Sequence, residues 1–137
     1  MRRRGQQYLI DDRYEGRSLE VYTIDGEKLL GLVDEVATFE LGMVVEGEPV
    51  VVNRKAILYV VTGLSDIHGW SQAECCENDY VLDEDFIGSD VVVKLVNGDE
   101  INGRLMKVSR YELGVVQGNR AFIIPRRSVS FVRITSR

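Results

Sequence analysis

Two pairs of basic residues are the first candidates for chemistry in this sequence. They are Arg54-Lys55 and Arg126-Arg127, and each pair lies in a short polar stretch between two apolar runs. Such a stretch is typical of a turn, where cationic side chains face solvent and can contact the phosphate groups of a nucleic acid. The alternative is a solvated turn that only contributes to solubility.

Other reactive side chains gather between positions 62 and 79. This segment contains His68, Trp70, Cys75 and Cys76 together with several carboxylates. Zinc sites usually separate paired cysteines by about two to four residues, and adjacent cysteines also strain a disulfide. We therefore interpret the segment as an ordinary interdomain linker, with a metal or redox function at Cys75 and Cys76 as the remote alternative.

Motifs of common enzymes are absent from the sequence. The chain has one histidine and no P-loop, nucleophile-elbow or dinucleotide-binding motif. Its many carboxylates are scattered over stretches that read as exposed strand faces. We therefore expect no catalytic activity, no bound metal and no cofactor.

Composition and charge bound the class of protein. The chain has 137 residues, 45% of them hydrophobic and 28% charged, which is typical of a soluble globular protein. A net charge of -5 excludes a simple polycation that coats nucleic acid. No apolar run approaches the roughly 18 residues that span a bilayer, and no apolar stretch follows the basic start of the chain, 1–5. We expect a cytoplasmic protein without a membrane partner.

An internal repeat sets the domain organisation. A shift of 72 positions aligns residues 8–61 with 80–133 without a gap, and 13 of 54 positions are identical. The identical pairs include Tyr8/Tyr80, Gly31/Gly103, Glu40/Glu112 and Arg54/Arg126. The sequence predicts a basic arm followed by a first unit over 1–61, a linker over 62–79 and a second unit over 80–137.

Each repeat reads as five short strands. In the first repeat we expect strands over 19–24, 28–36, 39–45, 50–52 and 57–61, with one helical turn or irregular cap at 8–12. Asp25-Gly26 and Asn97-Gly98 predict type I′ hairpin turns. Gly31 and Gly103, inside the second strand of each repeat, predict a bend or bulge. Five short bent strands favour a small barrel, so we expect an all-β chain of two tandem five-stranded barrels.

Charge is divided unequally between the repeats. The first carries 5 basic and 11 acidic residues, and the second carries 8 basic and 7 acidic residues. Because affinity for a nucleic acid depends largely on neutralising phosphates, the second repeat is the better candidate for binding one. The alternative is that local charge at a basic turn, including Arg54 and Lys55, controls binding.

The residues over 21–31 and 93–103 resemble the first motif of Sm-like (LSm/Hfq) proteins, especially the Hfq branch. In that family two glycines five residues apart flank the hairpin turn and the bend of the second strand. Both basic pairs, each followed by a small and an aliphatic residue, are similar to the second motif of Hfq. The resemblance implies barrels that assemble edge to edge into a ring and bind single-stranded RNA, U-rich or A-rich.

The resemblance also implies which side chains contact RNA. Phe39 and Tyr111 match the position whose side chain stacks on a base, and the two basic pairs match the pore side of the ring. The implied RNA-binding set is Phe39, Arg54, Lys55, Tyr111, Arg126 and Arg127. The alternative for the two rings is that they are core residues.

Assembly and role follow from the same resemblance. We expect self-association into a ring of three chains that supplies six barrels, with two stacked rings as the alternative. The implied role is that of an RNA chaperone or RNA-protein scaffold. The rival is an oligomeric protein-interaction module without RNA binding, because the first repeat is acidic and Ala37 and Leu41 replace an Asp and an Asn found in relatives of this family.

Overall fold

The computed structural model describes residues 8–64 and 78–137, and strands dominate both ranges. The strands of the first repeat are β1 (Ser18–Thr23), β2 (Lys28–Val36), β3 (Glu40–Val45), β4 (Glu48–Asn53) and β5 (Ile57–Gly63). Those of the second repeat are β6 (Asp90–Leu95), β7 (Glu100–Val108), β8 (Glu112–Gln117), β9 (Arg120–Pro125) and β10 (Val129–Ser136). The expected all-β class is confirmed, and the observed strands fall close to the predicted ranges.

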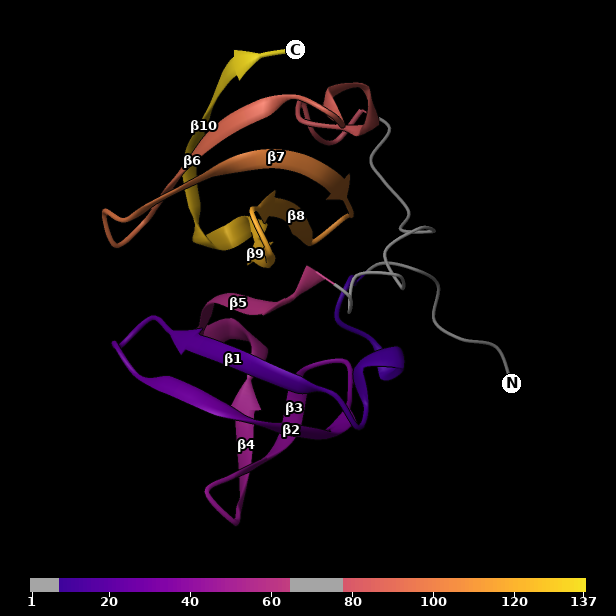
Figure 1. Cartoon of the computed structure of the whole chain (residues 1–137), viewed down its shortest axis with the longest axis vertical. Coiled ribbons are helices and arrows are strands. Elements are labelled where there is room, and N and C mark those ends of the chain that lie inside the picture. The colour runs from indigo at the N-terminus through magenta and orange to yellow at the C-terminus, as the bar shows by residue number, and fades with distance from the viewer. Residues whose placement is uncertain (1–7, 65–77) are drawn as a thin grey trace.

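All ten strands belong to one antiparallel sheet. Its order is β10-β6-β7-β8-β9-β5-β1-β2-β3-β4, so each repeat contributes a continuous block of five strands. The sheet is open, with β10 and β4 at its two ends, and these strands lie at opposite ends of the molecule (Figure 1). Within the described residues no hydrogen-bond ladder closes either block into a separate barrel.

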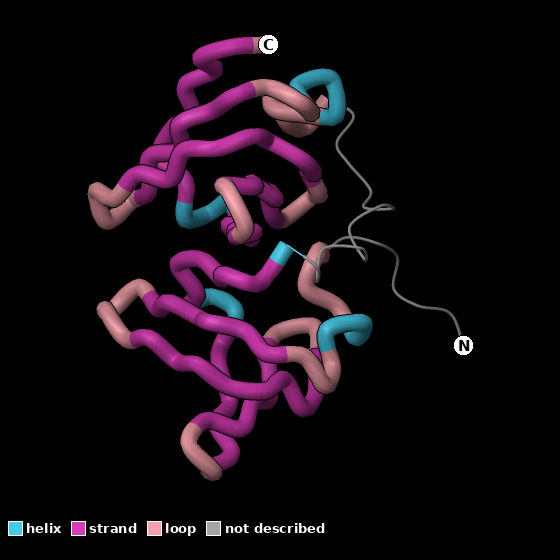
Figure 2. The backbone as a smooth tube through the Cα atoms, viewed as in Figure 1, coloured by secondary structure: helices cyan, strands magenta, loops and turns pink. Residues whose placement is uncertain are grey.

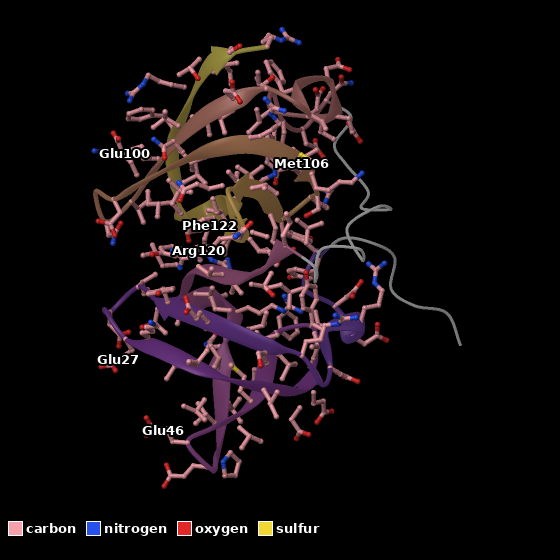
Figure 3. All side chains as sticks on the ribbon, in the orientation of Figure 1. Glu27, Glu46, Glu100, Met106, Arg120 and Phe122 are labelled. Atoms are coloured by element: carbon pink, nitrogen blue, oxygen red, sulfur yellow. The ribbon has the colours of Figure 1, made fainter. Side chains whose placement is uncertain are left out.

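The two repeats join through β5 and β9. Val60 pairs with Ile123, Val61 with Phe122, Thr62 with Ala121 and Gly63 with Arg120. The side chains of Arg120 and Phe122 lie between the two halves of the molecule (Figure 3). This junction therefore continues the sheet from one repeat into the other, and strand β5 extends two residues into the stretch predicted as linker.

The junction also joins the two hydrophobic cores. One cluster is built on the first repeat and includes Ala121 and Ile123 from β9. The other is built on the second repeat and includes Leu58 and Val61 from β5. Because the side chains of a strand alternate between its two faces, each joining strand supplies apolar groups to both clusters.

The hairpin prediction is wrong in its turn type. Gly26 has a φ of 94°, but Asp25 does not have the positive φ that a type I′ turn requires at its first central residue. The amide of Gly26 donates to the carbonyl of Thr23, and the amide of Thr23 donates to the carbonyl of Glu27. This pattern is a type I turn followed by a left-handed glycine, which closes a three-residue loop.

Gly31 in β2 and Gly103 in β7 allow the neighbouring strand to approach closely. A Cβ added at Gly31 would collide with the carbonyl oxygen of Val44, and one at Gly103 with that of Val116. The pairing register of β2 shifts only after Val33, so the bulge lies beyond the glycine rather than at it. The second repeat shows the same arrangement, because β7 shifts after Leu105.

Short 3-10 turns complete the fold (Figure 2). The helical turn expected at 8–12 occurs at Asp12–Tyr14, where the carboxylate of Asp11 accepts from the amide of Arg13, and its counterpart is Glu84–Phe86. Two further 3-10 turns, Arg54–Ala56 and Arg126–Ser128, connect the fourth and fifth strands of each repeat. They place the two basic pairs beside the junction.

Candidate nucleic-acid interface

A cavity of about 710 Å³ lies beside the junction of the two repeats. Both 3-10 turns with basic pairs line it, together with the loops that precede β3 and β8. All six residues of the predicted RNA-binding set line this cavity, namely Phe39, Arg54, Lys55, Tyr111, Arg126 and Arg127. Residues predicted separately in two repeats therefore come together in one place.

Arg54 is buried, so the expectation that it faces solvent is wrong. Its side chain is 8% exposed and donates to the carbonyl oxygens of Ala37 and Ile10, at 3.1 and 2.8 Å from Nη2. Its guanidinium also lies 4.0 Å from the centre of the Tyr8 ring. Burial lowers the pKa of Arg54, against the opposing effect of Glu112. These contacts indicate that Arg54 stabilises the junction between the repeats and is not free to bind a ligand.

Arg126 repeats this arrangement in the second unit. Its guanidinium donates to the carbonyl oxygens of Ser109 and Leu82, both at 3.0 Å, and lies 3.9 Å from the centre of the Tyr80 ring. Arg126 is half-buried, and burial lowers its pKa, whereas nearby Tyr80 raises it. The acidic residues that act on Arg126 are Asp83 and Glu84, which also raise its pKa.

Exposed cations at the cavity are Lys55, Arg110 and Arg127. Lys55 follows Asn53, whose side chain caps the 3-10 turn by accepting from the Lys55 amide at 2.9 Å. Arg127 donates to the carbonyl of Arg54 at 3.3 Å, and Arg110 lies 3.4 Å from Asp79 in an exposed ion pair. Exposed ion pairs are weak, so all three cations can meet an anion at this surface.

The two predicted stacking residues differ in their surroundings. Phe39 is 75% exposed, which overturns the core alternative for this ring. Tyr111 is stacked on Tyr8, with ring centres 4.9 Å apart and planes 22° from parallel. One face of Tyr111 is therefore covered by the N-terminal segment, whereas the ring of Phe39 is open to a flat ligand.

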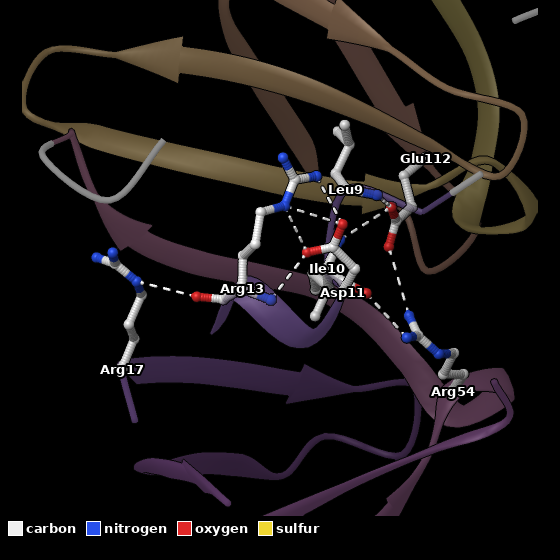
Figure 4. A network of polar contacts seen from close by, with 7 residues as sticks. All are labelled: Leu9, Ile10, Asp11, Arg13, Arg17, Arg54 and Glu112. Carbon is white, nitrogen blue, oxygen red and sulfur yellow. Dashed lines mark hydrogen bonds and ion pairs between the residues drawn. The ribbon is translucent and has the colours of Figure 1, made fainter. Parts of the chain in front are cut away.

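Besides Arg110, sequence analysis missed Glu112 at this site. Its buried carboxylate accepts from the backbone amides of Leu9 and Ile10 and lies 3.8 Å from Arg54 (Figure 4). Burial raises the pKa of Glu112 to about 7, although Arg54 and the two amides oppose the rise. The signal that could have found it is the identity Glu40/Glu112 in the repeat alignment.

The predicted linker cluster is not placed. His68, Trp70, Cys75 and Cys76 lie outside the described residues. Within 8–64 and 78–137, no group of three or more His, Cys, Asp or Glu side chains could hold a metal ion. In the same ranges, no helix has the length and apolar character needed to cross a membrane.

Comparison with known proteins yields no relative: no family model, no curated protein and no solved structure matches the chain.

Proposed function

We propose that this chain is an Sm-like RNA-binding protein that acts in the cytoplasm as an RNA chaperone or RNA-protein scaffold. The observation that carries the proposal is the convergence of all six predicted residues on one cavity. A role without catalysis is part of the proposal, and the exposed lining of the cavity includes cations and aromatic rings. The Sm-like assignment and the tandem five-stranded barrels belong to this proposal and rest on the motif resemblance.

In this proposal the exposed cations of the cavity bind the phosphate groups of the RNA. Lys55, Arg110 and Arg127 line it from both repeats. Each phosphate neutralised by such a cation releases counterions, which makes binding weaken as salt rises. Arg54 and Arg126 support the surface by holding the loops behind it, since their guanidinium groups donate to backbone carbonyls.

In this proposal the aromatic side chains of the cavity stack on the bases of the RNA. The exposed ring of Phe39 offers a stacking platform of the kind that single-stranded RNA uses without strict sequence preference. Tyr111 lines the same cavity, with one of its faces against Tyr8. The expected ligand is a U-rich or A-rich single strand.

Ring assembly is part of the same proposal. The β5–β9 junction is already an edge-to-edge contact between units, and β4 and β10 remain as open edges. A head-to-tail contact of this type closes into a ring when its rotation fits. Three chains with six units in one ring is the proposed stoichiometry.

Titration of labelled oligo-U and oligo-A at low and moderate salt tests RNA binding. The informative variants are Lys55→Ala and Arg127→Ala, and the matched control is Arg104→Ala, whose side chain lies in an exposed ion pair with Asp90 away from this cavity. We expect each cavity variant to weaken binding and to reduce the salt slope by about one. No binding to either oligonucleotide at low salt refutes the proposal.

The rival function is an oligomeric protein-interaction module that does not bind RNA. The burial of Arg54, the backbone contacts of Arg126 and the covered face of Tyr111 favour it, because three of the six predicted contacts are occupied by the chain itself. The same titration separates the two functions. The rival predicts no salt-dependent binding of either oligonucleotide.

A further inference from the structure

Tyr8 covers one face of Tyr111 in the cavity beside the junction. The two rings are stacked, with centres 4.9 Å apart and planes 22° from parallel. The guanidinium of Arg54 lies 4.0 Å from the centre of the Tyr8 ring. Tyr8 is half-buried, and Tyr111 remains 40% exposed. A flat ring of the chain itself therefore lies on a residue that is predicted to stack on RNA.

The surroundings of the Tyr8 ring are of the kind that a nucleobase finds in RNA-binding proteins. Bases of single-stranded RNA stack on aromatic side chains and on the guanidinium plane of arginine. Tyr8 packs on one group of each kind, Tyr111 and Arg54. The exposed cations of the proposed interface line the same cavity. The ring of Tyr8 thus fills a place that suits a base of a bound strand.

The backbone that follows Tyr8 is held in place by contacts that do not involve the Tyr8 side chain. The amides of Leu9 and Ile10 donate to the carboxylate of Glu112, and the carbonyl of Ile10 accepts from Arg54 at 2.8 Å. The side chains of Leu9 and Ile10 are 1% and 2% exposed. Rotation about the side-chain bonds of Tyr8 can therefore move its ring off Tyr111 while this backbone stays anchored.

The second repeat contains the same tyrosine and arginine in contact. Tyr80 is the counterpart of Tyr8, and the guanidinium of Arg126 lies 3.9 Å from the centre of its ring. Phe39, the counterpart of Tyr111, is 75% exposed. The contact between tyrosine and arginine thus belongs to each repeat. Among the described residues, a cover over a predicted stacking residue is seen at the junction alone.

We propose that the side chain of Tyr8 is an autoinhibitory cover, which occupies the place of a nucleobase on Tyr111 and must rotate away before a base of RNA can stack there. The ligand is a single-stranded RNA, and the inference rests on the proposed function. The chain then offers two unequal stacking sites, an open one at Phe39 and a covered one at Tyr111.

The cover lowers the affinity for RNA through the population of the open state. When a site can bind only in a minor conformation, the observed affinity falls by the fraction of molecules in that conformation. The stacked pair of rings and the cation–π contact both favour the closed position of Tyr8. We expect removal of the Tyr8 ring to raise the affinity by about 5- to 50-fold.

The first test compares Tyr8→Ala with wild type in titrations of labelled oligo-U and oligo-A. Tyr8→Ala should bind at least one of them more tightly by this factor, and Tyr8→Phe should bind like wild type because it keeps a ring over Tyr111. The matched control is Tyr22→Ala, which removes a half-buried tyrosine that is stacked on Tyr59 and does not line the cavity. The control should show no gain. Unchanged or lower affinity of a folded Tyr8→Ala variant overturns the proposal.

A double variant tests whether the gain arises at Tyr111. In a Tyr111→Ala background, Tyr8→Ala should no longer raise the affinity, because the face that it uncovers has been removed. Circular dichroism confirms that each variant is folded. A gain of the same size in both backgrounds overturns the proposal.

Fluorine NMR tests the displacement of Tyr8 without removing its ring, so this measurement does not depend on the folding of Tyr8→Ala. The tyrosines are replaced by fluorotyrosine, and the variants Tyr8→Phe and Tyr111→Phe assign the two signals by their absence. Addition of oligo-U or oligo-A should shift the signals of Tyr8 and Tyr111 together. A Tyr8 signal that is unchanged when RNA saturates the protein overturns the proposal.

The outcomes distinguish the cover from the proposed function. Equal binding of RNA by wild type and Tyr8→Ala refutes the cover and leaves RNA binding in place. No binding of either oligonucleotide to wild type and to Tyr8→Ala at low salt refutes the proposed function, and the cover with it.

Discussion

Arg54 and Glu112 lie 3.8 Å apart across the junction of the two repeats, and both side chains are buried. The guanidinium also donates to two backbone carbonyls and the carboxylate accepts from two backbone amides. A buried ion pair is costly to desolvate and stabilises only when its remaining polar atoms find partners. Here those partners come from the N-terminal segment and from Ala37, so the pair fixes that segment and both repeats in one arrangement.

Glu112→Ala should destabilise the protein strongly. The variant leaves the buried guanidinium of Arg54 without its carboxyl partner, which costs on the order of 3 kcal/mol. Glu112→Gln keeps an acceptor for the amides of Leu9 and Ile10 and should cost much less. Urea denaturation of the two variants, with Glu27→Ala as an exposed control, measures the difference. Equal losses for Ala and Gln would show that the acceptor contacts are unimportant.

The stability of the protein should depend on pH through Glu112. Burial raises the pKa of this carboxyl to about 7 from its usual 4.5, so the folded chain keeps a proton that the unfolded chain has released. Its contribution is therefore full below about pH 4.5 and is lost as the pH rises through about 7. The difference in unfolding free energy between Glu112→Gln and wild type, measured at pH 5 and 8, should shift in favour of the variant at pH 8. A difference that is constant over this range contradicts the assignment.

Gly31→Ala should destabilise the first repeat. Its Cβ would collide with the carbonyl oxygen of Val44 on the neighbouring strand, and relief of such overpacking costs about 1 to 3 kcal/mol. Gly42→Ala is the matched control, because its Cβ would meet its nearest neighbours at an ordinary 3.7 Å. Thermal melts of the two variants provide the comparison. A smaller loss for Gly31→Ala than for Gly42→Ala would contradict the steric explanation.

Local patterns in the sequence predicted most of the strands. The alternation of residues and the position of turn residues placed the strand at 28–36 at the bounds that β2 has, and the other strands of the first repeat within about two residues. The turn at Asp25-Gly26 was located correctly but given the wrong type, because dipeptide composition does not set the φ of Asp25. Local physics therefore predicts where elements lie better than it predicts their detailed geometry.

Local sequence patterns did not predict contacts between residues that are far apart in the sequence. Arg54 lies in a polar turn and gives no local sign of burial, because its partner Glu112 is far away in the sequence. Likewise, nothing near Tyr111 indicates that Tyr8 covers it. The repeat alignment nevertheless contained these residues, since Glu40/Glu112, Tyr8/Tyr80 and Arg54/Arg126 are identical pairs. A pair retained in both repeats could have marked a contact made by each.

Phe39→Ala should weaken binding of oligo-U or oligo-A, if the exposed ring is a stacking platform as proposed. Loss of one base-stacking contact costs about 1 to 3 kcal/mol, equivalent to a decrease in affinity of roughly 5- to 150-fold. Phe39→Trp should retain affinity because it preserves an aromatic face. Ile24→Ala, an exposed apolar residue that does not line the cavity, is the control. The mass of each variant is measured first, because Phe39 precedes β3, which pairs with β4 at an open edge proposed to bind a second copy. Unchanged affinity for Phe39→Ala in an assembly of normal mass would remove this residue from the RNA interface and leave binding to the cations at Lys55, Arg110 and Arg127.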